Sequence, residues 1–266
     1  MATDNNNKLL ALSVGEKSNR TLDYTQNNIK VGGVDYIKFS TIDELEATIE
    51  SGKYFSIITI FDCEDSSMQQ TNIDIAKSLS KLEKFQISLL INEEFTAKSE
   101  QIDELKAICK NSMVVDGAAI VNICDYTNGH DGDATIEGYI YRFIYLVYGS
   151  VVLNSPVNVD FADIVYAIDD KDLIGFASLD GKGDDLMGQF LGLLEIVRFS
   201  KSIEPNEEIS VIASIEGSNT MIKMEDIYKI LGSINSKFGD NCNIIWSLKD
   251  NSEYTDTLAL SILVSK

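Results

Sequence analysis

The sequence has few of the residues that build common catalytic or cross-linked sites. Its 266 residues include two prolines, one histidine and four cysteines. The cysteines are widely spaced and form no Cys-x-x-Cys pair, so we expect reduced thiols of a cytosolic protein. The histidine, His130, lies in the turn-like segment 128–133, where a surface position is expected rather than a catalytic one. The four cysteines are Cys63, Cys109, Cys124 and Cys242.

Long apolar runs and an excess of positive charge are also missing. No apolar run approaches the roughly 20 residues that cross a membrane. The first eight residues lack the apolar core of a signal peptide. We therefore expect a cytoplasmic protein without a membrane partner. The 22 basic side chains are outnumbered by 42 acidic ones, which gives a net charge of -20. Such a charge repels nucleic acid, so no nucleic-acid partner is expected.

In the first half of the chain, apolar strand patterns alternate with helix patterns. This order predicts an α/β domain with a mostly parallel sheet covered on both faces. A segment over 136–148 is apolar on most sides and predicts a helix buried between layers. The expected strands are 8–15, 36–41, 55–61, 85–91 and 112–115, and the expected helices are 42–51, 72–82 and 99–110.

The second half has a different order of elements. It predicts an α+β layer in which helices lie on one face of a mixed sheet. The expected strands are 173–178, 208–215, 242–247 and 258–264, and the expected helices are 184–200 and 224–238.

The segment Asn158-Val159-Asp160-Phe161-Ala162-Asp163 separates an extended run from an apolar helix pattern. Pro156 disfavours a helix before it, and Asn158 or Asp160 can cap the helix that follows. A carboxylate in the first turn also suits the helix dipole. One interpretation of the segment is therefore a well-capped helix start.

The same six residues resemble the synergy loop of FtsZ, the bacterial tubulin homologue. In that family the loop of one subunit reaches the nucleotide of its neighbour in a filament. Its carboxylates help to polarise the water that attacks the γ-phosphate. The resemblance therefore implies that Asn158, Asp160 and Asp163 act in trans, on a nucleotide held by another subunit.

The resemblance extends over nearly the whole chain and is clearest for 151–266, including the ending Asn243-Ile244-Ile245-Trp246. It implies the tubulin/FtsZ-like two-domain fold: a Rossmann-like N-terminal domain with a parallel sheet (1–135), a central helix (136–150) and a C-terminal α+β domain with a mixed sheet (151–266). The family's linker and terminal partner-binding peptide have no counterpart after Lys266, so docking to membrane adaptors through such a peptide is not expected.

The phosphate-binding loops depart from the family pattern. The first, 14–20, has one glycine, and the second, 61–68, has none. Glycine permits bare backbone N–H groups to approach a phosphate. The second loop instead carries Asp62, Glu64 and Asp65. A like charge at about 4 Å costs on the order of 4 kcal/mol at an effective dielectric near 20, which exceeds the roughly 0.3–1 kcal/mol of a helix dipole.

We therefore expect these carboxylates to form a solvated acidic loop, with Ser66 or Ser67 capping the next helix. The loop lacks the ligand spacing of a magnesium or calcium site. Recognition of a guanine base is not expected either, because 139–142 reads Tyr-Ile-Tyr-Arg where the family has an acidic or amide side chain. No cofactor-binding residue and no metal ligand is predicted.

Three functions remain open. The first is a divergent FtsZ-like protein of the cytoskeleton or cell division, a pseudo-GTPase that associates with itself or with an FtsZ-type protein. The second is an active GTPase in which Lys17, Arg20 and nearby serines replace the glycine loops, and only this alternative requires GTP. The third is a stand-alone binding module on a reused tubulin-type scaffold, with a basic partner.

Overall fold

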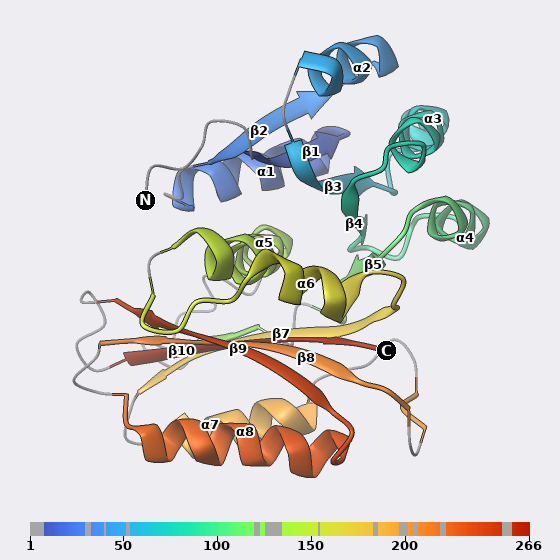
Figure 1. Ribbon diagram of the computed structural model, residues 1–266. Coiled ribbons are helices and arrows are strands. Elements are labelled where there is room, and N and C mark those ends of the chain that lie inside the picture. The colour runs from blue at the N-terminus through green and yellow to red at the C-terminus, as the bar shows by residue number, and fades with distance from the viewer. Residues whose placement is uncertain are drawn as a thin grey trace. The chain divides into compact units, whose positions relative to one another are not determined.

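The structure is a computed structural model (Figure 1). The residues it describes are 8–29, 33–39, 41–51, 54–119, 123–125, 135–153, 155–182, 186–196, 202–204, 207–218, 222–251 and 257–266. The chain divides into two compact units, Met1–Ala118 and Ala119–Lys266. Helix α5 (Ile136–Val152), expected to link two domains, belongs to the second unit in this division. His130 with its turn and the side chain of Cys124 lie outside the described part.

The first unit is built on a five-stranded parallel sheet in the order β2-β1-β3-β4-β5. The parallel pairing of these strands confirms the expected parallel sheet. Its central strands are long apolar runs because both faces of the sheet are covered. The strands are β1 (Lys8–Val14), β2 (Val34–Phe39), β3 (Tyr54–Asp62), β4 (Phe85–Asn92) and β5 (Ser112–Asp116).

In the part of the first unit that the structure describes, four helices cover this sheet. Helices α2, α3 and α4 lie side by side on one face, and α1 lies on the other (Figure 1). The core under α2, α3 and α4 includes Leu45, Ile73, Leu79 and Leu105, which are almost fully buried. The helices are α1 (Glu16–Asn28), α2 (Ile42–Ser51), α3 (Gln69–Ser80) and α4 (Ser99–Ile108).

The first of these helices was not expected from the sequence. The buried side of α1 is made mostly of hydroxyl side chains at helical spacing, Ser18, Thr21 and Thr25, with Leu22. Each hydroxyl donates to a backbone carbonyl one turn earlier, over 2.9 to 3.0 Å. These bonds satisfy the buried polar groups, so a helix with little apolar surface still packs on the sheet.

The second unit contains a mixed sheet, as expected, with five strands in the order β6-β7-β10-β8-β9, of which the edge strand β6 was not expected from the sequence. Strands β6 and β7 are parallel, as are β8 and β9, and β10 runs antiparallel between β7 and β8. The strands are β6 (Ile123–Asp125), β7 (Leu173–Lys182), β8 (Ser210–Gly217), β9 (Asn243–Asp250) and β10 (Thr257–Ser265).

The expectation that helices cover only one face of this sheet is wrong. Helices α7 (Leu186–Ile196) and α8 (Met224–Phe238) cover one face, and α5 (Ile136–Val152) and α6 (Phe161–Ile168) lie on the other (Figure 1). The reason is that side chains of both faces need cover, since alternate residues along the strands are buried on each side. None of the described helices has the length and apolar character needed to span a bilayer.

The two faces of this second sheet differ in chemistry. The face under α7 and α8 is apolar, with Leu179, Val211, Ile215 and Leu260 in one core. The face under α5 carries alternating polar residues, which bond to one another or to α5. Among them are Ser178, Asp180, Glu216, Ser247, Lys249 and Ser261.

Candidate functional site

The strand order of the first unit places a switch point at the carboxyl ends of β1 and β3. Ligands of such open α/β sheets bind in the crevice where the connections diverge to opposite sides. At this point the chain turns from β1 into α1 at Gly15, whose φ is 102°. A Cβ atom on Gly15 would lie 2.6 Å from Cβ of Asp62, the last residue of β3. Glycine is therefore required for the close approach of the two strand ends as well as for the backbone angle.

The carboxylate of Asp62 fills the start of α1. The backbone N–H of Lys17 donates to its Oδ2 over 2.9 Å, and the N–H groups of Glu64 and Asp65 donate to its Oδ1 over 3.1 and 3.3 Å. Asp62 is only 4% exposed, so the expectation of a solvated loop is wrong for this residue. The reason is that the positive end of a helix stabilises an anion, and here the chain supplies one itself.

The ammonium group of Lys17 lies among three glutamates. It is 2.6 Å from an oxygen of Glu64 and 3.3 Å from oxygens of Glu93 and Glu94. Burial opposes the charged form of Lys17, but the hydrogen bonds and charge of Glu64, with Glu93 and Glu94, outweigh it and raise the pKa of Lys17. The cluster is therefore an ion-paired network in which one cation offsets several carboxylates.

Among the described residues, these three glutamates form a group that could hold a metal ion. One oxygen from each lies within 4.8 Å of the others, a spacing compatible with an oxygen-liganded cation. In this structure the Lys17 ammonium contacts all three carboxylates, so the position of a cation is taken by a side chain of the same chain.

Glu64 also fixes the loop between β4 and α4. Its Oε1 accepts the N–H of Glu94 over 2.6 Å and the hydroxyl of Thr96 over 3.2 Å. Burial would raise the pKa of Glu64, but these bonds and Lys17 lower it. Its side chain is 7% exposed, so Glu64 too is wrongly expected to be solvated. Between these contacts, Phe95 has a φ of 57° and is 62% exposed, an unusual conformation for a bulky side chain.

The serines of the acidic loop do not cap α3. The backbone N–H and the hydroxyl of Ser67 both donate to Oδ1 of Asp65, over 2.9 and 2.6 Å. The N-cap position belongs to Met68, which makes no side-chain cap bond. The expected cap is wrong because Asp65 competes for the serine as a nearby acceptor. Burial, with the charge of Asp62, raises the pKa of the neighbouring Cys63 thiol to about 12, which makes it a poor nucleophile.

Several side chains that would have to form an alternative phosphate cradle bond to other groups of the chain. The hydroxyl of Ser13 donates to Oδ1 of Asn19 over 2.6 Å, and that of Ser18 donates to the carbonyl of Gly15 over 2.9 Å. Arg20 is exposed. Lys17, Ser13 and Ser18 are thus each bonded to other groups of the same chain.

Tyr139 and Arg142 of α5, which lie where the FtsZ family recognises the guanine base, point into the second unit. Tyr139 is 2% exposed and packs edge-on against Phe176, with ring centroids 5.0 Å apart. Arg142 is 8% exposed and pairs with Asp180 through both terminal nitrogens, over 2.9 and 2.5 Å. Both side chains therefore serve the packing of α5 on its sheet.

The loop at Asn158–Asp163 lies in the second unit and starts α6. Asp160 is the N-cap: its Oδ1 accepts the N–H of Ala162 over 3.1 Å, and Oδ2 of Asp163 accepts the N–H of Asp160 over 3.3 Å. This reciprocal pair is a capping box. Asn158, Asp160 and Asp163 are all exposed, while Val159 between them is 5% exposed and holds the loop to the unit. The loop thus caps the helix and also presents its carboxylates outward.

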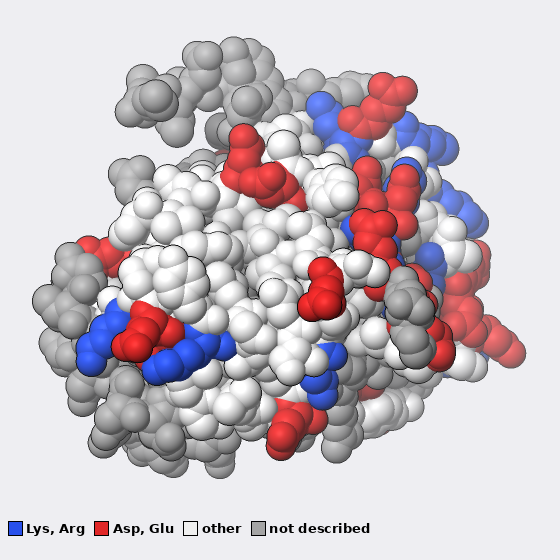
Figure 2. Space-filling model, turned by 60° about the horizontal axis from the view of Figure 1, so that its bottom comes forward, with Lys and Arg blue, Asp and Glu red and all other residues white. Residues whose placement is uncertain are grey.

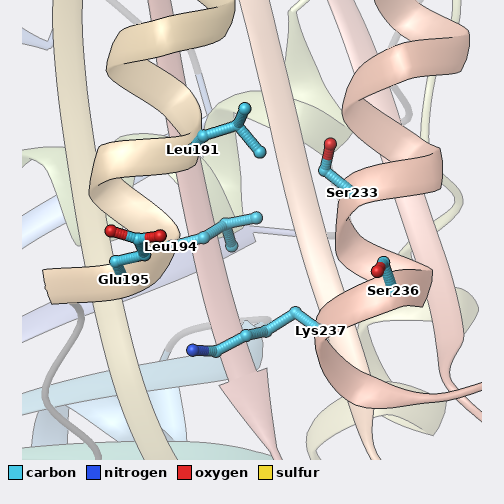
Figure 3. A pocket seen from close by; sticks show the side chains of 6 residues that line it. All are labelled: Leu191, Leu194, Glu195, Ser233, Ser236 and Lys237. Atoms are coloured by element: carbon cyan, nitrogen blue, oxygen red, sulfur yellow. The ribbon is translucent and has the colours of Figure 1, made fainter.

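A shallow hollow of about 270 Å³ lies between α7 and α8. Figure 3 shows Leu191 and Leu194 reaching from α7 toward α8, and the Lys237 side chain reaching the other way. Figure 2 turns these helices toward the viewer and shows a largely uncharged surface with scattered acidic and basic side chains. With two leucines, two serines, one acid and one lysine, the hollow carries no set of groups suited to catalysis.

The sequence itself matches no protein-family model and no curated protein. The fold, in contrast, is similar to solved structures of FtsZ and CetZ proteins. An empty FtsZ dimer from M. jannaschii matches with a TM-score of 0.70 and 10% identity, covering 97% of this chain and 88% of the FtsZ chain. CetZ2 from Haloferax volcanii, solved as a GTPγS-bound protofilament, gives 0.70 and 13%, covering 96% and 92%. CetZ from Methanosaeta thermophila gives 0.68 and 14%, covering 96% and 85%. The chain therefore has the FtsZ/tubulin-like fold.

Proposed function

We propose that this chain is a pseudo-GTPase of FtsZ/tubulin-like fold that holds no nucleotide of its own and presents Asp160 and Asp163 to the nucleotide of an FtsZ-type partner. The observation that carries the proposal is the Asp62 carboxylate at the start of α1, which accepts the Lys17 N–H over 2.9 Å. A carboxylate of the chain stands where a phosphate would need to accept that N–H.

Displacing this carboxylate would be costly. Asp62 is 4% exposed and accepts three backbone N–H bonds. Leaving a buried donor or acceptor unsatisfied costs about 1–3 kcal/mol for each group, and more for a charged one. An incoming triphosphate would also meet Glu64, Glu93 and Glu94, whose nearby cation, Lys17, is already paired with them.

The exposed loop at the start of α6 carries the carboxylates that would act on the partner's nucleotide. Asp160 and Asp163 each use one oxygen in the capping box, through Oδ1 and Oδ2 respectively. A carboxylate has a second oxygen, which can accept a hydrogen bond from a water molecule. The capping box holds both side chains in place, so a water between them and a partner's γ-phosphate would be oriented rather than diffusing.

The charge of the chain favours a different protein over a second copy as partner. In a head-to-tail contact between two copies, Asp160 and Asp163 of one would meet the Asp65, Glu93 and Glu94 edge of the other. With a net charge of -20, each copy also repels the other at longer range. Association as such is supported by the similar structures, one of which is an FtsZ dimer and another a CetZ2 protofilament.

The first test is nucleotide binding to the purified chain. We expect isothermal titration with GTP and Mg²⁺ to show no binding and the purified protein to carry no guanine nucleotide. A dissociation constant tighter than about 10 μM, equivalent to roughly 7 kcal/mol, would overturn the proposal and favour the active GTPase.

The second test is complementation in trans. An FtsZ whose own synergy-loop carboxylates have been replaced keeps its nucleotide site but cannot serve its neighbour. We expect this chain to restore GTP hydrolysis by that FtsZ, and Asp160→Asn and Asp163→Asn variants to fail. Asparagine keeps an oxygen that can cap the helix, so these variants remove the charge without removing the cap. If neither wild type nor variants bind FtsZ, the chain is a stand-alone module instead.

A further inference from the structure

One large side chain on the outer side of α6 is exposed. The buried side of this helix carries Ile164, Ala167 and Ile168. Tyr166 points the other way and is 64% exposed. Single exposed aromatic rings are common on protein surfaces, so what distinguishes Tyr166 is where it lies and what holds it.

The ring of Tyr166 is held in place from one side. The Lys171 ammonium lies 5.2 Å from the ring centroid, within the range of a cation–π contact. Lys171 is itself fixed, because its Nζ donates to the hydroxyl of Ser210 over 2.9 Å and to Glu208 over 3.4 Å. Its side chain is only 18% exposed. The ring therefore has less conformational freedom to lose when a partner covers it.

Tyr166 shares a surface with the capping carboxylates. It follows Asp163 by three residues on the same helix, so the two side chains are neighbours on one side. Asp160 lies at the start of that side and Asp169 and Asp170 lie just past its end, and all of them are exposed. A partner that contacts the Asp160 and Asp163 carboxylates would also cover Tyr166.

We propose that Tyr166 is the binding anchor of this surface and inserts its ring into an apolar pocket with a basic rim on the FtsZ-type partner. Tyrosine is among the residues that most often supply the binding energy of an interface. The surrounding aspartates supply the charge that a basic rim would match. The inference rests on the proposed function and adds to it a residue that supplies affinity rather than chemistry.

The test separates affinity from chemistry. Hydrolysis by the loop-inactivated FtsZ is measured against increasing concentrations of this chain and of its variants. We expect Tyr166→Ala to raise the concentration for half-maximal stimulation at least about tenfold while the plateau rate is unchanged. Asp160→Asn should lower the plateau. Tyr166→Phe keeps the ring and should stay close to wild type.

Tyr228 provides the matched control. It is 67% exposed on α8, which lies on the other face of the same sheet (Figure 1). Tyr228→Ala should leave the half-maximal concentration within about twofold, since that side chain is not on the α6 surface. If Tyr166→Ala behaves like Tyr228→Ala while wild type stimulates FtsZ, the anchor is refuted and the proposed function stands. If wild type neither binds nor stimulates FtsZ, both fall.

Discussion

At the scale of single residues, Lys249 carries an amino group in the interior of the second unit. The side chain is 3% exposed, with its Nζ 3.9 Å from the ring centroid of Tyr145 and 3.2 Å from that residue's carbonyl oxygen. A Cβ on Gly149 would lie 3.1 Å from this Nζ, so the glycine leaves the room that the amine needs. Burial lowers the pKa of Lys249 to about 8, and the charge of Glu216 opposes the shift only in part.

This lowered pKa predicts how stability depends on pH. The unfolded chain holds the Lys249 proton up to its ordinary pKa of 10.5, whereas the folded chain releases it near 8. Between these values the unfolded state binds more protons, so the free energy of unfolding rises with pH. We expect a contribution on the order of 3 kcal/mol across this window, measured by urea unfolding between pH 7.5 and about 10.

The variant Lys249→Met separates the contribution of Lys249 from the contributions of other titrating groups. Lys249→Met has a similar volume and no proton to release, so the free energy of unfolding of wild type should gain on that of the variant by this amount across the window. Other groups titrate in or near this range: burial raises the pKa of the Cys63 and Cys242 thiols from 9.0 to about 12 and about 11, and burial with Asp35 raises the pKa of Tyr54 from 10.0 to about 12. In each of these groups the unfolded state releases its proton first, so the free energy of unfolding falls as pH rises, which is opposite in sign to the effect of Lys249. Parallel curves for wild type and Lys249→Met would refute the assignment.

At the scale of the element, α6 must be tested for stability before its loop is tested for function. Asp160→Ala removes the N-cap oxygen and should lower the free energy of unfolding by about 1 kcal/mol. Asp160→Asn keeps an acceptor at the same place and should cost only a few tenths of a kcal/mol. Urea unfolding of the three proteins checks the order. Equal losses for both variants would mean that the charge and not the cap stabilises the helix.

Most elements could be predicted from the sequence because their apolar residues recur at a clear period. Strand β3 and helix α8 are examples: their apolar residues lie inside, as the pattern indicates. Helix α1 could not be found this way, because Ser18, Thr21 and Thr25 form its buried side. The signal available was their spacing, which matches a helix when hydroxyl residues are counted as potential core residues.

The acidic loop shows the limit of reasoning from charge alone. Three carboxylates within four residues predict a solvated loop, but Asp62 is buried and the side chain of Glu64 is only 7% exposed. Their partners are the Lys17 backbone N–H and its ammonium, 45 and 47 residues earlier in the chain. No local pattern contains that pairing, since it depends on β1 and β3 being neighbours in the sheet. The absence of a glycine-rich cradle, by contrast, could be seen directly in the sequence.

At the scale of the whole molecule, the net charge distinguishes self-association from association with another protein. Charges on separate molecules interact over a screening length of about 10 Å in 0.1 M salt and about 3 Å in 1 M salt. Contacts between two copies of this acidic chain are repulsive and should be relieved by salt. Contacts between its aspartate-rich α6 surface and a basic partner are attractive and should be weakened by salt.

Sedimentation velocity can distinguish the two cases, because rising salt should favour association between copies of this chain and weaken association with a basic partner. We expect the isolated chain to remain monomeric in about 0.1 M NaCl and a mixed complex with FtsZ to form there and to dissociate as NaCl rises toward about 1 M. Filaments of the isolated chain in low salt that dissolve in high salt would contradict this, because they would require attraction between like-charged copies. The sign of the salt dependence thus identifies the class of partner, since screening acts on the charge that each surface carries.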